Sequence, residues 1–178
     1  MTSRRPALDL ISHSPEQTRA VGARLGRLAR PGDVYLLRGT LGAGKTVLAQ
    51  GVARGLGVEG YVQSPTFTLA TEHRGVTADG HAVILYHLDL YRIEAPAEVM
   101  TFGFEEYLDD PDGIVVIEWP ERAQADLPET YLLVELEHLA DEKRRLVLRP
   151  RGERYVTLVE ELRAEVAGAR RGPAPARD

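Results

Sequence analysis

The chain has 178 residues, of which 43% are hydrophobic and 28% are charged, and its net charge is −5 at pH 7. This length and composition are typical of one globular domain with a substantial core. The absence of cysteine excludes disulfides and thiolate metal sites. The negative charge argues against broad electrostatic capture of nucleic acid by this chain alone.

We expect neither a targeting signal nor a membrane span in this sequence. Ser3-Arg4-Arg5 resembles the start of a twin-arginine export signal, but polar and charged residues follow where an apolar run is needed. No stretch approaches the ~20 apolar residues of a membrane span. We therefore expect a cytoplasmic protein without membrane contact. It should have a single domain over residues 1–167 and a disordered Gly/Pro/Ala/Arg-rich tail over residues 168–178.

The chain should begin with a short strand over residues 7–11 and then a helix. Ser14-Pro15-Glu16-Gln17 places Ser at the N-cap, Pro at the first helical position and Gln at the third, which is a capping box. Apolar residues continue at helical spacing until Pro31-Gly32 ends the helix. This helix would either flank the base of a bound nucleotide or simply pack against the core.

A glycine-rich segment, Gly39-Thr40-Leu41-Gly42-Ala43-Gly44-Lys45-Thr46, fits G-x-x-x-x-G-K-[ST] at every fixed position. A β-prone run over 33–38 precedes it and a helical pattern over 47–56 follows. Glycines let consecutive backbone N–H groups converge on phosphate oxygens. Lys45 would reach the β- and γ-phosphates and the Thr46 hydroxyl would ligate Mg²⁺. The segment predicts a nucleoside triphosphate site.

An ordinary glycine-rich turn is the alternative interpretation, and lysine usage argues against it. Lys45 and Lys143 are the only lysines in a chain that otherwise uses arginine. A compact ammonium and a planar guanidinium are not interchangeable at a phosphate.

The loop Gln63-Ser64-Pro65-Thr66-Phe67-Thr68 is stiffened by its proline. Thr66 thus offers a hydroxyl one helix beyond the glycine-rich segment. In nucleotide switches a threonine so placed senses the γ-phosphate or completes the Mg²⁺ shell. A structural turn is the simpler interpretation, and the pattern leaves both open.

Two hydrophobic strands should each end on an acid. The strands over 68–73 and 82–89 are expected to form a hairpin, and the second ends at Asp89; the strand over 113–118 ends at Glu118. A carboxylate at the tip of a buried strand is the Walker B arrangement, in which it holds Mg²⁺ directly or through water. Either acid could be the one nearer the metal, and an unspecialised acid at a strand end is the alternative for each.

Two further residues beside these acids have two interpretations. His87 is either a base or phosphate donor, or a histidine that packs in the core with its polar atoms satisfied, which we favour. Trp119, the only tryptophan, would either cover the site or pack in the core.

The remaining elements complete an α/β domain. Short helices are expected over 96–101 and 105–108, an antiparallel pair of strands over 131–138 and 144–149, and an amphipathic helix over 155–166. With a hairpin beside parallel strands, the expected fold is a P-loop NTPase three-layer sandwich with a mixed parallel/antiparallel sheet.

The chain closely resembles the TsaE (YjeE) family of bacterial ATPases, required for threonylcarbamoyladenosine modification of tRNA. Four segments in order carry the resemblance: the glycine-rich segment, Ser64-Pro65-Thr66-Phe67, His87-Leu88-Asp89-Leu90-Tyr91-Arg92 and Ile117-Glu118-Trp119-Pro120. It extends from about Ile11 to Leu162. The chain departs from the family at Thr40, where an acid is usual, and at Val47, where a second hydroxyl residue is common.

The resemblance implies ATP and Mg²⁺ as cofactors. It also implies work in a complex with TsaD and TsaB, with tRNA reached indirectly through that complex. By position, the implied catalytic residues are Lys45, Glu118, Thr66 and Asp89, and the implied metal-side residues are Thr46, Glu118 and Asp89. The implied nucleotide-binding residues are Leu41, Gly42, Ala43, Gly44, Lys45, Thr46 and Val47, with Thr18 near the adenine and Trp119 near the nucleotide.

Two competing functions remain. A P-loop small-molecule kinase has this length but usually needs an Arg-rich lid, and the candidate region holds only scattered Arg92 and Arg122. A non-hydrolysing switch that docks partners would need no metal-side acid. A GTPase is disfavoured because guanine recognition through N-K-x-D needs an asparagine and the chain has none.

Overall fold

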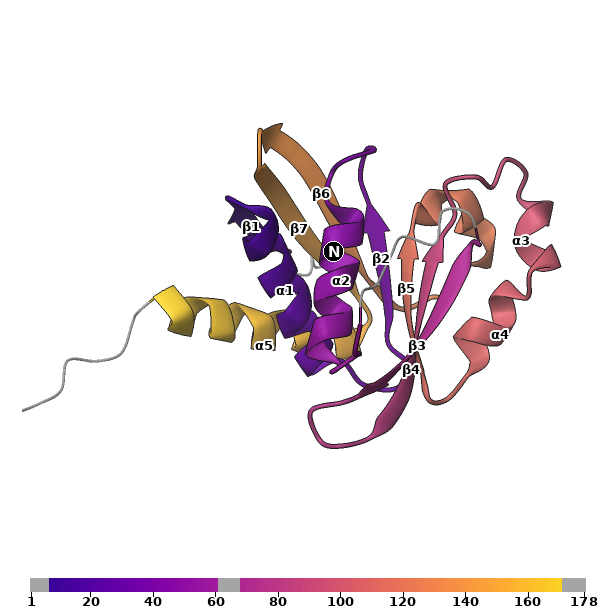
Figure 1. Cartoon of the computed structure of the whole chain (residues 1–178), viewed down its shortest axis with the longest axis horizontal. Coiled ribbons are helices and arrows are strands. Elements are labelled where there is room, and N and C mark those ends of the chain that lie inside the picture. Colours follow the sequence, from indigo (N-terminus) through magenta and orange to yellow (C-terminus); the bar gives the residue numbers. More distant parts are fainter. Residues whose placement is uncertain (1–6, 61–67, 171–178) are drawn as a thin grey trace, which may run out of the picture.

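A computed structural model describes residues 7–60 and 68–170 (Figure 1). The strands in these residues are β1 (Leu8–Ser12), β2 (Val34–Arg38), β3 (Ala70–Val76), β4 (Ala82–Asp89), β5 (Gly113–Glu118), β6 (Tyr131–Ala140) and β7 (Lys143–Arg151). They form one sheet in the order β1-β7-β6-β2-β5-β4-β3. The central strands β6, β2, β5 and β4 are parallel, and β1, β7 and β3 pair antiparallel. The mixed sheet predicted from the hairpin is confirmed.

Helices cover both faces of this sheet. They are α1 (Pro15–Leu28), α2 (Lys45–Gly55), α3 (Ala97–Thr101), α4 (Phe104–Asp109) and α5 (Glu153–Arg170), with a 3₁₀ helix η1 (Pro120–Asp126). One hydrophobic cluster joins α1, α2 and α5 to one face, and a second joins α3, α4 and η1 to the other. In Figure 1, α1 and α2 lie side by side in front of the sheet and α3 and α4 lie beyond β4. The result is a three-layer α/β sandwich.

The burial of the strands follows their position in the sheet. Every residue of β5 is buried, as expected for a central strand covered on both faces, whereas in β7, nearer the end of the sheet, only Leu146 and Leu148 are buried. The parallel register places Asp89 directly opposite Glu118. Both strands therefore end at the same edge, which is the edge where β2 enters the glycine-rich segment.

The predicted start of α1 is confirmed, with one difference in its capping. The N–H of Gln17 donates to Ser14 Oγ at 3.2 Å, as a capping box requires. The Gln17 side chain, however, accepts from the N–H of His13 at 2.8 Å, one residue before the N-cap. The reciprocal bond is thus kept but displaced by one residue.

Some boundaries differ from those predicted. α5 continues to Arg170, so residues 168–170, assigned to a disordered tail, are helical; two alanines flank Gly168, and one glycine costs a helix only about 1 kcal/mol. η1 was not predicted. The loop over 63–67 and residues 171–178 lie outside the described residues. Within the described ranges, none of the helices combines the length and apolar character that crossing a bilayer needs.

α1 and α2 touch through their backbones. Two glycines on each helix line the contact: Gly22, Gly26, Gly51 and Gly55. A Cβ added to Gly22 would lie 2.2 Å from the carbonyl oxygen of Leu48, and one added to Gly51 would lie 2.2 Å from that of Arg19. These helices carry the predicted base-side residue Thr18 and the predicted phosphate-side residue Lys45. Glycine at the crossing therefore brings the two parts of the predicted site close together.

We predict that Gly51→Ala lowers the free energy of unfolding by about 1–3 kcal/mol, because the new methyl group must displace rigid backbone. This loss should appear although alanine raises helix propensity. Gly168→Ala is the control: in the described part of the chain no atom lies within 4 Å of the added Cβ, so it should be neutral or stabilising by up to ~1 kcal/mol. Urea denaturation of both variants measures the difference, and an unchanged Gly51→Ala would contradict the contact.

The start of α5 is tied to the start of β2 by buried polar contacts. Arg154 donates to the Asp33 carboxylate at 3.0 and 2.7 Å. The backbone N–H of Val34 donates to the Tyr155 hydroxyl oxygen at 2.8 Å. Burial raises the pKa of Tyr155 to about 12. The folded state thus favours the neutral phenol.

We predict that Tyr155→Phe destabilises the protein by about 1–3 kcal/mol at pH 8, because it leaves the buried Val34 N–H without its acceptor. Because its pKa is higher in the folded state, Tyr155 contributes to the stability of the wild type. This contribution is complete below the unfolded-state pKa near 10 and is lost as pH rises through 12. The stability gap between the two proteins should therefore narrow from pH 10 to pH 12. Parallel curves in urea titrations over this range would show that Tyr155 is not the titrating group.

Candidate functional site

The glycine-rich segment forms a tight loop between β2 and α2. Gly42 and Gly44 have φ of +78° and +102°, which glycine adopts without strain. Gly44 is the N-cap of α2 and has no side chain that could occupy the first amide groups of the helix. A Cβ on Gly39 would lie 2.6 Å from the carbonyl oxygen of Leu136 on β6. The loop therefore presents backbone N–H groups and the positive end of a helix to the space above it.

Lys45 lies at the base of this loop with only 4% of its surface exposed. Its Nζ donates to the carbonyl oxygens of Gly39 and Thr40 at 2.7 and 2.8 Å, and lies 4.4 Å from the centre of the Trp119 ring. Burial lowers the pKa of Lys45, and the carboxylates of Glu118, Glu121 and Asp89 oppose that shift. A buried ammonium held by neutral carbonyls is well suited to receive an anion.

Thr46 and Glu118 meet at the first turn of α2. The Thr46 hydroxyl lies 3.0 and 3.2 Å from the two carboxylate oxygens of Glu118, so it donates to that group. Glu118 is 2% exposed and also accepts from His87 Nε2 at 2.6 Å. Glu118, the last residue of β5, is thereby held against Thr46, the residue that follows Lys45.

Asp89 is the second buried acid of the site. It is 5% exposed, its Oδ1 accepts from the N–H of Tyr91 at 3.0 Å, and it sits opposite Glu118 in the parallel register. Residues opposite each other in register point to the same face of a sheet, so two carboxylates face α2 together. Two like charges at such a position repel each other, and a nearby cation offsets this repulsion. Lys45 is one such cation.

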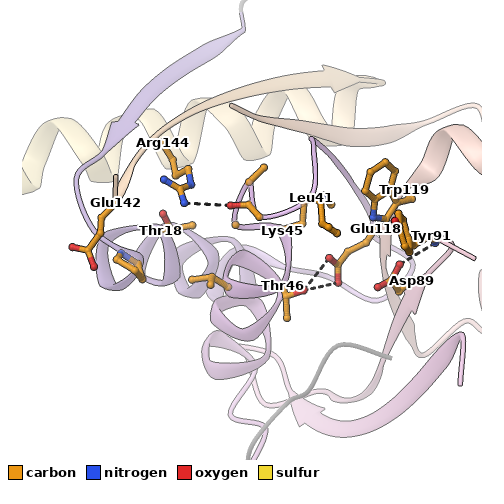
Figure 2. Close-up of a pocket in the computed structure, with 15 residues that line it drawn as sticks. Thr18, Leu41, Lys45, Thr46, Asp89, Tyr91, Glu118, Trp119, Glu142 and Arg144 are labelled. Carbon is orange, nitrogen blue, oxygen red and sulfur yellow. Dashed lines mark hydrogen bonds between the residues drawn. The ribbon is translucent and has the colours of Figure 1, made fainter. Parts of the chain in front are cut away.

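A cavity of about 430 Å³ extends over these residues (Figure 2). Its lining includes every described residue for which a site role was predicted: Thr18, Leu41, Gly42, Ala43, Gly44, Lys45, Thr46, Val47, Asp89, Glu118 and Trp119. In Figure 2, Asp89, Tyr91 and Trp119 stand at one end and Thr18, Glu142 and Arg144 at the other. Thr66 lies outside the described residues, so its predicted role stays a prediction.

The structure adds four lining residues that were not predicted: Pro15, Tyr91, Glu142 and Arg144. Tyr91 packs its ring 5.0 Å from that of Trp119, and Arg144 donates to the carbonyl oxygen of Gly42 at 3.2 Å. Tyr91 could have been found, because it follows Asp89 by two residues. Glu142 and Arg144 reach the site only through the pairing of β6 with β2, which no local pattern shows.

The structure bears on two of the open interpretations. His87 is 1% exposed and lies in the core, as favoured, but only part of its polar capacity is satisfied: Nε2 contacts Glu118, whereas Nδ1 has no hydrogen-bond partner among the described residues. Trp119 lines the cavity, with a left-handed backbone (φ +59°) that turns the chain from β5 into η1. The buried Thr18 hydroxyl lies 2.6 Å from Ser12 Oγ, which itself donates to the Ser14 carbonyl oxygen. Thr18 thus joins the end of β1 to the start of α1 beside the cavity.

A three-layer sandwich with a mixed sheet, and a glycine-rich loop leading from a central strand into a helix, is the architecture of P-loop NTPases. Comparison with known proteins narrows this class. The family model described as threonylcarbamoyl adenosine biosynthesis protein TsaE matches residues 12–146. The chain belongs to the TsaE family.

Individual relatives agree with this assignment. The protein named tRNA threonylcarbamoyladenosine biosynthesis protein TsaE in Bacillus subtilis is 38% identical over 149 residues, which cover 84% of this chain and 89% of the relative. The protein of the same name in Treponema pallidum is 37% identical over 138 residues, covering 78% and 97%. The crystal structure of YdiB from Bacillus subtilis superposes with a TM-score of 0.75 at 33% identity, covering 90% of this chain and 97% of that one. The predicted fold is confirmed.

Proposed function

We propose that this protein is a Mg²⁺-dependent ATPase that supports threonylcarbamoylation of adenosine 37 in tRNAs reading ANN codons. It would act with TsaD and TsaB. One observation carries the proposal: Lys45, Thr46 and Glu118 line one cavity, in which the Thr46 hydroxyl donates to Glu118 and Lys45 Nζ lies 4.4 Å from the centre of the Trp119 ring. The family's role in tRNA threonylcarbamoyladenosine biosynthesis supplies the biological setting.

Phosphate binding would use the loop and its lysine. The amide groups at the start of α2 point an uncapped positive helix end into the cavity. The Lys45 ammonium can exchange its two carbonyl partners for phosphate oxygens. Hydrogen bonds to the phosphate oxygens are stronger because these oxygens carry negative charge. Lys45 would then neutralise charge on the β- and γ-phosphates as the bond to the γ-phosphorus breaks.

The residues also fit a magnesium ion. Hydroxyl and carboxylate oxygens are the ligands that Mg²⁺ prefers, and Thr46 supplies the first, Glu118 and Asp89 the second. Among the described residues, no three His, Cys, Asp or Glu side chains are arranged to hold a metal. Phosphate oxygens and water would therefore complete the shell, as they usually do for Mg²⁺ in nucleotide sites. The ion would supply charge neutralisation at the phosphates, and Glu118 would hold it in place.

The remaining lining residues would position the nucleotide. Thr18 and Pro15 at the start of α1 would lie on the base side; Figure 2 shows Thr18 at the end of the cavity away from Trp119. Trp119, which lines the cavity, would cover the phosphate end and exclude water from it. The net charge of −5 favours contact with tRNA through the complex rather than directly, and such work belongs in the cytoplasm.

A small-molecule kinase is the alternative. It would need a pocket for an acceptor next to the phosphate end, in addition to the cavity of about 430 Å³ that would hold the nucleotide. Incubation with Mg-ATP and a panel of nucleosides and sugars separates the two: phosphorylation of any acceptor would favour the kinase.

We predict that Lys45→Ala weakens Mg-ATP binding by about 10- to 100-fold, because it removes a charged donor from a buried phosphate site. Isothermal titration calorimetry measures the affinity, and the melting temperature checks that the variant folds. Lys143→Ala is the matched control, since Lys143 is the chain's other lysine and is exposed on β7, and its affinity should not change. Normal binding by Lys45→Ala would contradict the proposal.

A further inference from the structure

His87 is a buried histidine that no role assigned so far explains. It lies on β4, two residues before Asp89, and only 1% of its surface is exposed. Its Nε2 is 2.6 Å from Glu118 Oε2 on the neighbouring strand. In the parallel register His87 is opposite Val116 and Asp89 is opposite Glu118, so His87, Asp89 and Glu118 share the sheet face toward α2.

The direction of this hydrogen bond follows from its partners. An ionised carboxylate only accepts hydrogen bonds, so the proton between the two groups belongs to His87 Nε2. The Thr46 hydroxyl donates its single hydrogen bond to Glu118 from the other side. His87 Nδ1 is buried and has no hydrogen-bond partner among the described residues. The hydrogen bond to Glu118 is therefore the polar contact that the structure shows for the His87 side chain, and it uses Nε2.

The contact makes the two oxygens of Glu118 unequal. Oε2 lies 2.6 Å from His87 Nε2 and 3.2 Å from the Thr46 hydroxyl oxygen, whereas Oε1 lies 3.0 Å from the Thr46 hydroxyl oxygen. A glutamate has three rotatable bonds, and this one faces the like charge of Asp89 across the register. Without His87, only the shared Thr46 hydroxyl, among the hydrogen-bond donors of the described residues, would hold the carboxylate against the repulsion of Asp89, and the Glu118 side chain could turn away from the loop.

We propose that His87 is the positioning residue of Glu118: its Nε2–H pins Oε2 and thereby keeps Oε1 on the Thr46 side for the metal. This inference rests on the proposed function, because the metal-side role of Glu118 belongs to it. Hydrogen-bonding partners behind a metal-side carboxylate typically change metal affinity or activity 10- to 100-fold when they are removed. The contact is made to Glu118 and not to the nucleotide, so nucleotide binding without metal should not depend on it.

Two variants test the role. His87→Leu removes the donor and leaves an apolar side chain, whereas His87→Gln places an amide N–H close to the position of Nε2. ATP affinity is measured by calorimetry in EDTA and over a series of Mg²⁺ concentrations. His87→Leu should need about 10- to 100-fold more Mg²⁺ for the same effect while its affinity in EDTA stays within about twofold of wild type. His87→Gln should recover most of the Mg²⁺ response.

Two outcomes of that titration would overturn the inference. One is an unchanged Mg²⁺ response in His87→Leu. The other is a parallel loss of affinity in EDTA and in Mg²⁺ in both variants, as a purely structural role would give. Melting temperatures report whether each variant folds.

A second measurement needs no nucleotide and separates this inference from the proposed function. Histidine side-chain ¹⁵N NMR of the wild type, assigned with His87→Gln, should show a protonated, hydrogen-bonded Nε2 at His87. Crystal structures should show Glu118 against Thr46 in the wild type and His87→Gln, and turned away in His87→Leu. An unprotonated Nε2, or an unmoved Glu118 in His87→Leu, would overturn the positioning role. A wild type that ignores Mg-ATP would instead contradict the proposed function alone.

Discussion

The carboxyl ends of parallel strands meet at one edge of a sheet, and this constraint determines where the polar chemistry of the molecule gathers. β2 delivers the glycine-rich loop to that edge, β5 delivers Glu118 and β4 delivers Asp89. β5 is buried along its whole length and β4 over its last three residues, so the strand tips beside the polar loop are the places where a carboxylate can lie. Two acids opposite each other in register then require a cation, and Lys45 and the proposed magnesium ion answer that requirement.

Features that depend on neighbours in sequence were predictable. The loop from Gly39 to Gly44 follows from glycine positions, because only glycine allows the left-handed turn at Gly44 and the close approach of Gly39 to β6. The start of α1 follows from Ser14 and Pro15, and the buried strands ending at Asp89 and Glu118 follow from their apolar runs. The structure brings the described candidate residues, including those implied only by the family resemblance, such as Thr18, to one cavity.

Features that depend on pairing across the sheet were not predictable. The Arg144 contact with Gly42 needs β6 beside β2, and the His87 contact with Glu118 needs the register of β4 against β5. A glycine inside a helix, such as Gly51, suggests lower helix stability until its partner backbone is known. A glycine such as Gly168 favours the end of a helix, but α5 continues to Arg170. The high helix propensity of the flanking alanines outweighs the low helix propensity of this one glycine.

On the basis of the fold, the cavity and the family membership, we propose that the protein hydrolyses ATP and that this hydrolysis supports tRNA modification. Steady-state Mg-ATP turnover by the purified chain, alone and with the TsaD–TsaB pair of its host, tests this claim most directly. The account predicts slow turnover alone, clear stimulation by the pair, and loss of that stimulated rate in Glu118→Gln. Fast turnover alone that the pair leaves unchanged, or a Glu118→Gln variant as active as wild type, would contradict it.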